Sequence, residues 1–448
     1  MPKILDGRLA GIGSDVPADS EELARQQAVK QIEARRRFKI STAAGRGTVL
    51  LTVLAMAALA LAGCGSPRPG ASSPAGARIV AQQLARSGAA SVIVFVSDHG
   101  HSTVATAGTA PPAAGQRFRI GSVTKTFTAT LVLQLVDQNR IGLDDPVGRY
   151  LPGVIPAGGT ITIRELLQHR SGLVDYTYYS SWMDQAERSP SIRPVDALRL
   201  AASQPLLFAP GSQWDYSSTN YIALGLVIEK VTGHPFGQEL QQRILTPLAL
   251  NRTELATTRR LPDLHDPGTN PNLGWAAGVI VSDARDLARF FSALLSGHLV
   301  SRASLAKMTR TVPGSLGIFS EDGLGIFATS LPCGRFWGHP GRILNYATLV
   351  AASGNGAHIK VISVRGPLGQ LSTDESALLC PALAPGLFVP NKRAPGRLLV
   401  VRASAVCWRS CWLAIVRGRC CTCCCTAFAS SSYVPGRRRA APEGDAGL

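Results

Sequence analysis

Hydrophobic and polar positions follow two different periods along the central part of the chain. The apolar run 92–96, a turn at Asp98-His99-Gly100 and a second β-rich run at 103–106 predict a hairpin. Apolar residues at helical spacing then predict a long helix over 124–138. The same spacing predicts further helices at 77–87, 163–169, 194–202, 220–232, 236–245, 283–295 and 303–309. Strand signals return only at 347–351 and 358–364, followed by a helix-like stretch at 374–379.

The order of these elements predicts an α+β fold. A hairpin at the start, helices in the middle and strands at the end favour one antiparallel sheet assembled from both ends of the chain. Helices then flank that sheet and form a second, mostly helical lobe. We expect this domain to occupy residues 77–384.

Composition and charge exclude two classes of protein. Of the 448 residues, 45% are hydrophobic and 17% charged, which excludes a wholly disordered chain. The net charge of +17 is concentrated at the ends, with +3 in residues 1–66 and +8 in residues 391–448. The middle carries +6 and has no basic stripe with interleaved aromatics, so we do not expect nucleic-acid binding.

The N-terminus has the features of an export signal. Residues 48–63 form an uncharged apolar run of 16 residues, which is short for a spanning helix and typical of a signal peptide. Leu61-Ala62-Gly63-Cys64 resembles a bacterial lipobox, in which Cys64 would be lipidated, and 65–76 is typical of a linker. The alternatives are a plain signal peptide or an uncleaved anchor. We predict an exported protein that is lipid-anchored on the outer face of the cell membrane or secreted.

Two terminal segments lie outside these units. The extension 1–47 contains the basic cluster 35–39, which would stay in the cytoplasm, and its length fits either a cytoplasmic extension or a true start downstream of Met1. The tail 385–448 holds seven cysteines within 407–425 but lacks histidine and the paired spacing of zinc sites. We interpret the tail as disordered or out of frame, and we expect no metal and no cofactor.

Ser122 and Lys125 begin the long predicted helix and lie one turn apart on the same face. A serine hydroxyl needs a nearby base to act as a nucleophile, and a lysine held neutral by burial can serve. The helix N-terminus also favours negative charge on the serine oxygen. Taken alone, however, the Ser-x-x-Lys motif favours a capping serine.

The surrounding motifs resemble those of the serine β-lactamase and D-alanyl-D-alanine carboxypeptidase family. The resemblance is closest to secreted carboxypeptidases and to class C β-lactamase relatives, including their esterases. The similar segments are Ser122-Val123-Thr124-Lys125, Leu166-Leu167-Gln168-His169-Arg170-Ser171-Gly172, Asp215-Tyr216-Ser217-Ser218, Ala277-Gly278-Val279 and Gly338-His339-Pro340-Gly341. They extend over about residues 77–384 and imply the fold of that family and acyl transfer on a serine.

The first two motifs imply the groups that move protons. Ser122 would be the nucleophile, with Lys125 as its helical partner. Tyr216 would shuttle the proton between the nucleophile and the leaving group. A tyrosine can do this only if adjacent cations such as Lys125 favour its phenolate.

The third motif implies the groups that line the cleft. His339 would stand on a strand edge, and Gly341 would allow the backbone to approach the substrate closely. The N–H groups of Ser122 and Arg342 would form the oxyanion hole. We expect His169 to be structural.

The chain departs from the family pattern in three places. Ser218 stands where relatives carry Asn, and Pro340 replaces a Thr. Carboxypeptidase relatives carry Arg in the stretch 326–330 to hold the terminal carboxylate of the substrate, and this chain has no positive charge there. Arg335 or Arg342 could substitute. We therefore predict weak activity on free D-Ala-D-Ala termini and better activity on esters or amides without a carboxylate.

A disulfide is also expected. Outside the N-terminal signal and the tail, Cys333 and Cys380 are the only cysteines. Relatives carry a matching pair, and an exported domain allows the bond.

These observations together predict an exported serine hydrolase that acts through an acyl-enzyme on Ser122. The expected substrates are D-Ala-D-Ala-type peptides, β-lactams or esters, and we expect a monomer. The alternative is a non-catalytic penicillin- or cell-wall-binding lipoprotein, in which Ser218 and Pro340 mark lost turnover.

Overall fold

A computed structural model of the chain describes residues 74–264, 266–366 and 379–380. The predicted signal run, Cys64, nearly all of the linker, most of the helix-like stretch at 374–379 and the cysteine-rich tail lie outside the described residues. Within the described residues, no helix is both long enough and apolar enough to cross a membrane.

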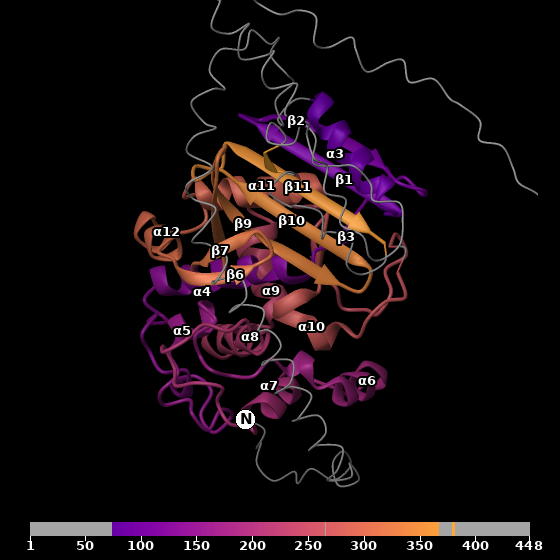
Figure 1. Cartoon of the computed structure of the whole chain (residues 1–448). Helices are drawn as coiled ribbons and strands as arrows, with labels where there is room; N and C mark the ends of the chain where they lie inside the picture. The colour runs from indigo at the N-terminus through magenta and orange to yellow at the C-terminus, as the bar shows by residue number, and fades with distance from the viewer. Residues whose placement is uncertain (1–73, 265, 367–378, 381–448) are drawn as a thin grey trace, which may run out of the picture. The chain divides into compact units, whose positions relative to one another are not determined.

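An eight-stranded antiparallel sheet joins strands from the two ends of the domain, in the order β2-β1-β11-β10-β9-β8-β7-β6 (Figure 1). The strands are β1 (Ser91–Asp98), β2 (His101–Ala107), β6 (Val312–Leu316), β7 (Phe319–Asp322), β8 (Phe327–Leu331), β9 (Gly334–Ile343), β10 (Tyr346–Ala352) and β11 (His358–Arg365). A second, three-stranded sheet contains β3 (Phe118–Arg119), β5 (Ile280–Ser282) and β4 (Glu254–Leu255). The predicted sheet built from both chain ends is confirmed.

Helices form the rest of the domain. They are α3 (Pro74–Arg86), α4 (Thr124–Asp137), α5 (Ile163–Leu167), α6 (Ser180–Arg188), α7 (Pro194–Ala202), α8 (Thr219–Thr232), α9 (Phe236–Leu240), α10 (Pro271–Gly278), α11 (Ala284–Leu295) and α12 (Arg302–Met308). Short 3₁₀ turns lie at Gly121–Val123 (η1), Val147–Arg149 (η2) and Tyr176–Tyr178 (η3), and a π-helical turn at Gln241–Leu245 (η4). The helices predicted within the described residues are present, whereas α6 and α10 were not predicted.

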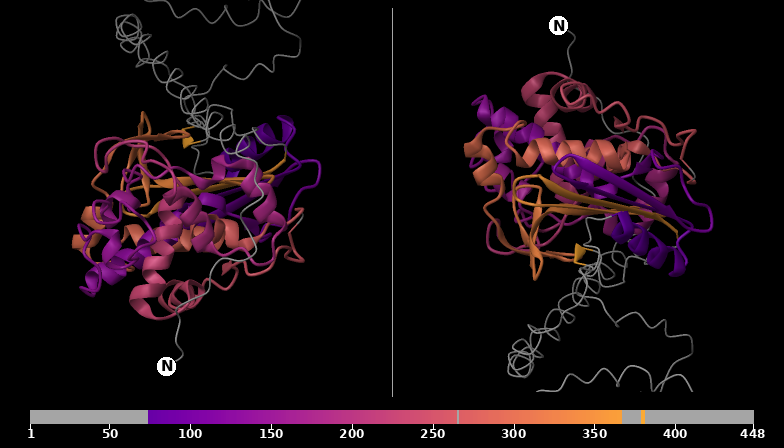
Figure 2. Two further views of the ribbon diagram at one scale, coloured as in Figure 1. Left: turned by 90° about the horizontal axis from the view of Figure 1, so that it is seen from below. Right: turned by 90° about the horizontal axis from the view of Figure 1, so that it is seen from above.

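The apolar run in β1 reflects a sheet that is covered on both faces. Successive side chains of a strand point to opposite faces. Val92, Val94 and Val96 therefore pack with α3, while Ile93 and Phe95 belong to the core that contains α11. Helices cover both faces of the sheet in the views of Figure 2. Because both faces are buried, the strand shows a continuous apolar run instead of an alternating pattern.

The hydrophobic pattern predicts no strand before residue 347 in the second half of the chain, and this prediction is wrong, because β4 to β9 lie there. Of these six strands, only β9 was expected, because the family resemblance placed His339 on a strand edge. The other strands of the large sheet in this region, β6 to β8, gave no signal. The sequences of β6 to β9 contain residues that usually disfavour strands, such as Pro313, Gly338 and Pro340. Gly338 is required by its neighbour: a Cβ at this position would lie 1.8 Å from the carbonyl oxygen of Val350. In this part of the sheet the sequence is constrained by how closely two backbones approach, and such a constraint does not produce the alternation of apolar residues by which a strand is predicted.

Cys333 and Cys380 form the disulfide expected from the sequence, with Cα atoms 5.9 Å apart, within the usual range. The bond connects the turn between β8 and β9 to the segment at Leu379. A loop of this length contributes about 4 kcal/mol to the free energy of unfolding on the chain-entropy model.

Candidate active site

Ser122 lies in the 3₁₀ turn η1, immediately before α4, and this turn is pressed against β9. Gly121 has φ +53°, and a Cβ there would lie 2.7 Å from the backbone nitrogen of Arg342. A Cβ at Gly341 would lie 2.0 Å from the carbonyl oxygen of Ile120 and 3.2 Å from the nitrogen of Ser122. Both glycines are therefore needed for the approach that brings the backbone nitrogens of Ser122 and Arg342 close together.

Lys125 is buried directly beneath the serine. Its Nζ donates hydrogen bonds to Ser122 Oγ at 3.1 Å and to the carbonyl oxygen of Ala277 at 2.8 Å, and the residue is only 1% exposed. No carboxylate forms an ion pair with it within the described part of the chain. Burial lowers the pKa of Lys125 to about 7, and the charge of Asp175 opposes this shift.

Tyr216 lies beside this lysine, with Nζ of Lys125 5.1 Å from the centre of its ring. Its hydroxyl is covered and makes no hydrogen bond of good geometry within the described residues. Burial raises the pKa of Tyr216 well above its ordinary value; the nearby Ser122 hydroxyl opposes this rise, and Asp175 adds to it. Burial thus favours the protonated phenol over the phenolate that a proton-shuttling tyrosine needs.

His169 forms hydrogen bonds with the residues immediately before and after Tyr216. Its carbonyl oxygen accepts the N–H of Asp215 at 3.0 Å, and its Nδ1 accepts the N–H of Ser217 at 3.2 Å. Its ring lies 4.2 Å from that of Tyr216. Burial lowers the pKa of His169 well below its ordinary value. The imidazole is thus a neutral positioning group, which agrees with the structural role expected for it.

His339, in β9, is completely buried in the same region. Its Nδ1 lies 2.5 Å from the carbonyl oxygen of Pro340, and its ring packs edge-on against Phe327 at 5.0 Å. Burial lowers the pKa of His339 to about 3, and Lys125 lowers it further. The third motif therefore contributes a neutral imidazole and no cation to the site.

Two buried carboxyl groups near the site were missed by sequence analysis. Asp175 accepts hydrogen bonds from the N–H of Ser218 at 3.1 Å and from Thr177, so it fixes the start of α8. Asp322 accepts from Trp214 Nε1 at 2.7 Å, and burial raises the pKa of Asp322 well above its ordinary value. The position of Asp175, three residues after the Ser171-Gly172 pair of a recognised motif, was the only available signal.

The structure separates the two arginines proposed to hold a carboxylate. Arg335 donates to Glu321 Oε2 at 2.7 Å and lies over the ring of Trp337 at 5.0 Å. Its guanidinium is therefore paired with a carboxylate of the protein itself. Arg342 is exposed and forms no ion pair within the described residues. The stretch 326–329 is buried and apolar apart from one threonine. Ser218, the other substrate-binding candidate, is half-buried at the N-cap of α8.

A sequence model of the Beta-lactamase family matches residues 77–361. The chain belongs to this family. Its members include serine esterases, amidases and DD-peptidases, so the protein is a serine hydrolase by family. The predicted fold and family are both confirmed by this match.

Individual relatives are similar over parts of their length. Penicillin-binding protein 4* of Bacillus subtilis is 29% identical, covering 52% of this chain and 57% of that protein. Esterase EstB of Burkholderia gladioli is 40% identical over 145 residues, covering 30% of this chain and 37% of that protein. The chain thus spans little more than half the length of the penicillin-binding protein and less of the esterase.

A solved structure covers more of its own chain. The D-stereospecific amidohydrolase from a Streptomyces species is 33% identical, with a TM-score of 0.60, and the match covers 64% of this chain and 94% of that one. The match supports both the Beta-lactamase fold and the family.

Proposed function

We propose that this Beta-lactamase-family hydrolase acts by forming an acyl-enzyme on Ser122. The observation that carries the proposal is the 3.1 Å contact between Lys125 Nζ and Ser122 Oγ, made by a lysine whose pKa is about 7. Near neutral pH a large fraction of such a lysine is uncharged and can accept the hydroxyl proton. An ordinary exposed lysine would be almost entirely protonated there.

Each proton then has a donor and an acceptor. Lys125 takes the proton of Ser122 as Oγ attacks the carbonyl carbon, and the backbone N–H groups of Ser122 and Arg342 stabilise the oxyanion. Once Lys125 carries the serine proton it is a cation beside the Tyr216 ring, so Tyr216 can donate its proton to the departing oxygen or nitrogen and recover one from Lys125. Water then attacks the ester carbonyl and gives its proton to Lys125, which returns it to Ser122 Oγ as the acyl C–O bond breaks and the acid is released.

We further propose esters and amides without a carboxylate on the leaving group as the preferred substrates, with D-Ala-D-Ala-type peptides and β-lactams acylating more slowly. A carboxylate brought into a cleft without a cation loses hydration that nothing replaces. The buried, uncharged stretch at 326–329 and the engaged Arg335 support this preference. The names of the similar esterase and D-stereospecific amidohydrolase are in line with it.

The proposed location is the outer face of the cell membrane, through a lipid on Cys64. The support is the lipobox-like sequence and the Cys333–Cys380 disulfide, since such bonds persist in oxidising compartments. Incorporation of labelled palmitate, and its loss in Cys64→Ser, tests the anchor. A soluble enzyme that carries no label in either variant would contradict it.

The catalytic proposal is tested by intact mass and turnover together. After treatment with an activated ester or a β-lactam, the mass is expected to rise by one acyl group and to return to its original value as the acyl-enzyme hydrolyses. Ser122→Ala should abolish the adduct, while Ser320→Ala, at an exposed serine in β7, should leave it unchanged. An adduct that persists in Ser122→Ala contradicts the nucleophile. An adduct on Ser122 that never hydrolyses supports the non-catalytic binding protein instead.

A further inference from the structure

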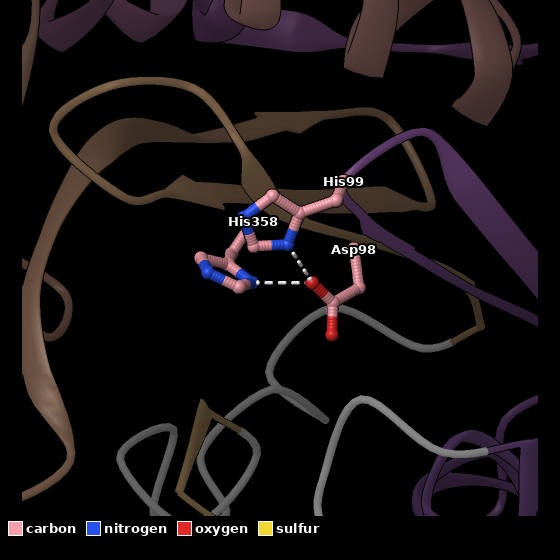
Figure 3. Close-up of side chains that lie close together, drawn as sticks. All are labelled: Asp98, His99 and His358. Carbon is pink, nitrogen blue, oxygen red and sulfur yellow. Dashed lines mark hydrogen bonds and ion pairs between the residues drawn. The ribbon is translucent and has the colours of Figure 1, made fainter.

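Three side chains with metal-binding atoms converge at the turn between β1 and β2, far from Ser122. Nδ1 of His99 lies 2.7 Å and Nδ1 of His358 lies 2.9 Å from the same oxygen of Asp98. Figure 3 shows the two imidazoles meeting at this oxygen, while the other oxygen points away from them. The three ligand atoms all lie within 4.8 Å of one another.

The backbone holds these residues in place before any ligand is present. Asp98 and His358 are paired directly across β1 and β11, so their side chains share one face of the sheet. The N–H of His99 donates to the carbonyl oxygen of Ala357 at 2.9 Å, which ties the turn to the start of β11. His99 has φ +47°, a conformation that hairpin turns usually give to Asn or Gly.

The cluster is separate from the active site. Gly341, beside Ser122, is connected through Thr348 of β10 to Ser363 of β11. His358 lies five residues farther along that strand, about 17 Å at the usual rise per residue. A ligand at the cluster would therefore not touch the nucleophile.

We propose that Asp98, His99 and His358 form a surface binding site for Zn²⁺ or a similar divalent transition-metal ion. Two imidazoles and one carboxylate are a ligand set that suits these ions. In a tetrahedral site with bonds of about 2.0–2.1 Å, neighbouring ligand atoms lie roughly 3.3 Å apart. The present N–O distances of 2.7 and 2.9 Å therefore need to open by about 0.4–0.6 Å, and the two Nδ1 atoms, which lie within 4.8 Å of each other, need to reach the same separation through rotation of the exposed side chains.

Binding also requires a proton shift within the site. An imidazole that offers Nδ1–H to Asp98 must carry its proton on Nε2 instead, which frees the Nδ1 lone pair for the metal. Water completes the coordination, because all three side chains are substantially exposed, at 41%, 70% and 48% for Asp98, His99 and His358. The bound ion would clamp the β1–β2 turn to β11.

Calorimetric titration of the full chain with ZnCl₂ tests this proposal. Free thiols are first alkylated with iodoacetamide, because the cysteines outside the described domain would compete for zinc. We expect His358→Gln and His99→Gln each to weaken one zinc site by about tenfold or more. We also expect zinc at a hundred times its Kd to raise the Tm of the unsubstituted protein by roughly 5 °C.

His234 provides the matched control. Its Nδ1 lies 2.8 Å from a carboxylate oxygen of Glu239, the same contact as at the cluster but with a single imidazole. His234→Gln should leave zinc affinity and the zinc-induced rise in Tm unchanged. The proposal is overturned if no zinc site weakens in His358→Gln and His99→Gln, or if His234→Gln weakens zinc binding as much as they do. Calorimetry at a temperature where all variants are folded keeps this outcome readable even if a variant has a lower Tm.

Discussion

Arg119 and Lys125 are two buried cations that lie three residues before and three residues after Ser122 in the sequence, and they differ in whether a carboxylate pairs with them. Arg119 donates through Nε to Asp266 Oδ2 at 2.8 Å, and both side chains are almost completely covered. Within the described residues, Lys125 donates hydrogen bonds to a hydroxyl and a carbonyl oxygen and lies over two tyrosine rings, but it pairs with no carboxylate. Burial with a counter-ion gives a charge fixed in place, whereas burial without one gives a group pushed towards its neutral form. On the proposed mechanism, a structural cation and a cation used for chemistry differ in whether a carboxylate pairs with them, and none of the described carboxylates pairs with Lys125.

The largest expected effect comes from removing the unpaired cation. Lys125→Met should lower kcat/KM for an ester by about 10⁴-fold or more, since the base is lost. At pH 6–7 the free energy of unfolding of the same variant should be higher than that of the unsubstituted protein by roughly 1–3 kcal/mol. The reason is that a lysine pKa lowered from 10.5 to about 7 marks a desolvation cost of about 5 kcal/mol, partly offset by its two hydrogen bonds.

The sign of this stability effect depends on pH. The unfolded lysine binds a proton up to pH 10.5, and the folded one only up to about 7. The gain from Lys125→Met is therefore full at pH 7 and below, and it disappears as the pH approaches 10.5. Urea unfolding at several pH values measures it. A variant that is less stable than the unsubstituted protein at pH 6 would show that Lys125 is a net stabilising group.

Removing the counter-ion of the paired cation should affect stability and leave the chemistry intact. Asp266→Asn strands the buried Arg119 charge, so we expect a loss of about 3–5 kcal/mol in the free energy of unfolding. The acylation rate per folded molecule should not change. Asp263→Asn is the control, because Asp263 pairs with Arg117 at a more exposed position and its loss should cost only about 1 kcal/mol. Equal losses in the two variants would remove the distinction between the pairs.

The pH profile of acylation tests whether the protonation of Lys125 controls the reaction rate. Below pH 7 the lysine is protonated, so kcat/KM should fall about tenfold for each further pH unit. Asp175 raises the pKa of Lys125, so in Asp175→Asn this acid limb should move to lower pH. Steady-state kinetics on a neutral ester measures both profiles. A limb that moves to higher pH, or stays in place, would mean that another group controls the rate.

The sequence predicted the parts of the fold that depend on local patterns. Apart from α6 and α10, the helices show apolar residues at helical spacing, and β1, β10 and β11 show apolar runs, because their side chains face cores on one or both sides. The strands β6 to β9 show no such pattern. At Gly338 and Gly341, the requirement is that two backbones come close, and that requirement leaves no apolar pattern.

The same limit applies to the site. The spacing of Ser122 and Lys125 alone favoured a capping serine, and the two residues were identified only because the motifs around them resemble those of a known family. Asp175 and Asp266 were not identified, because a counter-ion is defined by contact across the fold. The environment of Tyr216 could not be predicted for a related reason: its neighbours in sequence do not reveal that its hydroxyl is buried, and burial raises its pKa.

The smallest predicted effect concerns a third cation, Arg342, which lies beside the nucleophile but is exposed. Solvent screens such a charge, so it should attract a substrate carboxylate only weakly. Peptides with a free terminal carboxylate should therefore not exceed their methyl esters by tenfold, about 1.4 kcal/mol, in kcat/KM. Arg342→Gln should lower the ratio of free acid to ester by less than about tenfold. Arg335→Gln should not change it, because Glu321 already holds that guanidinium. A preference for the free acid of tenfold or more that vanishes in Arg342→Gln would show that this cation enters the cleft and binds the carboxylate.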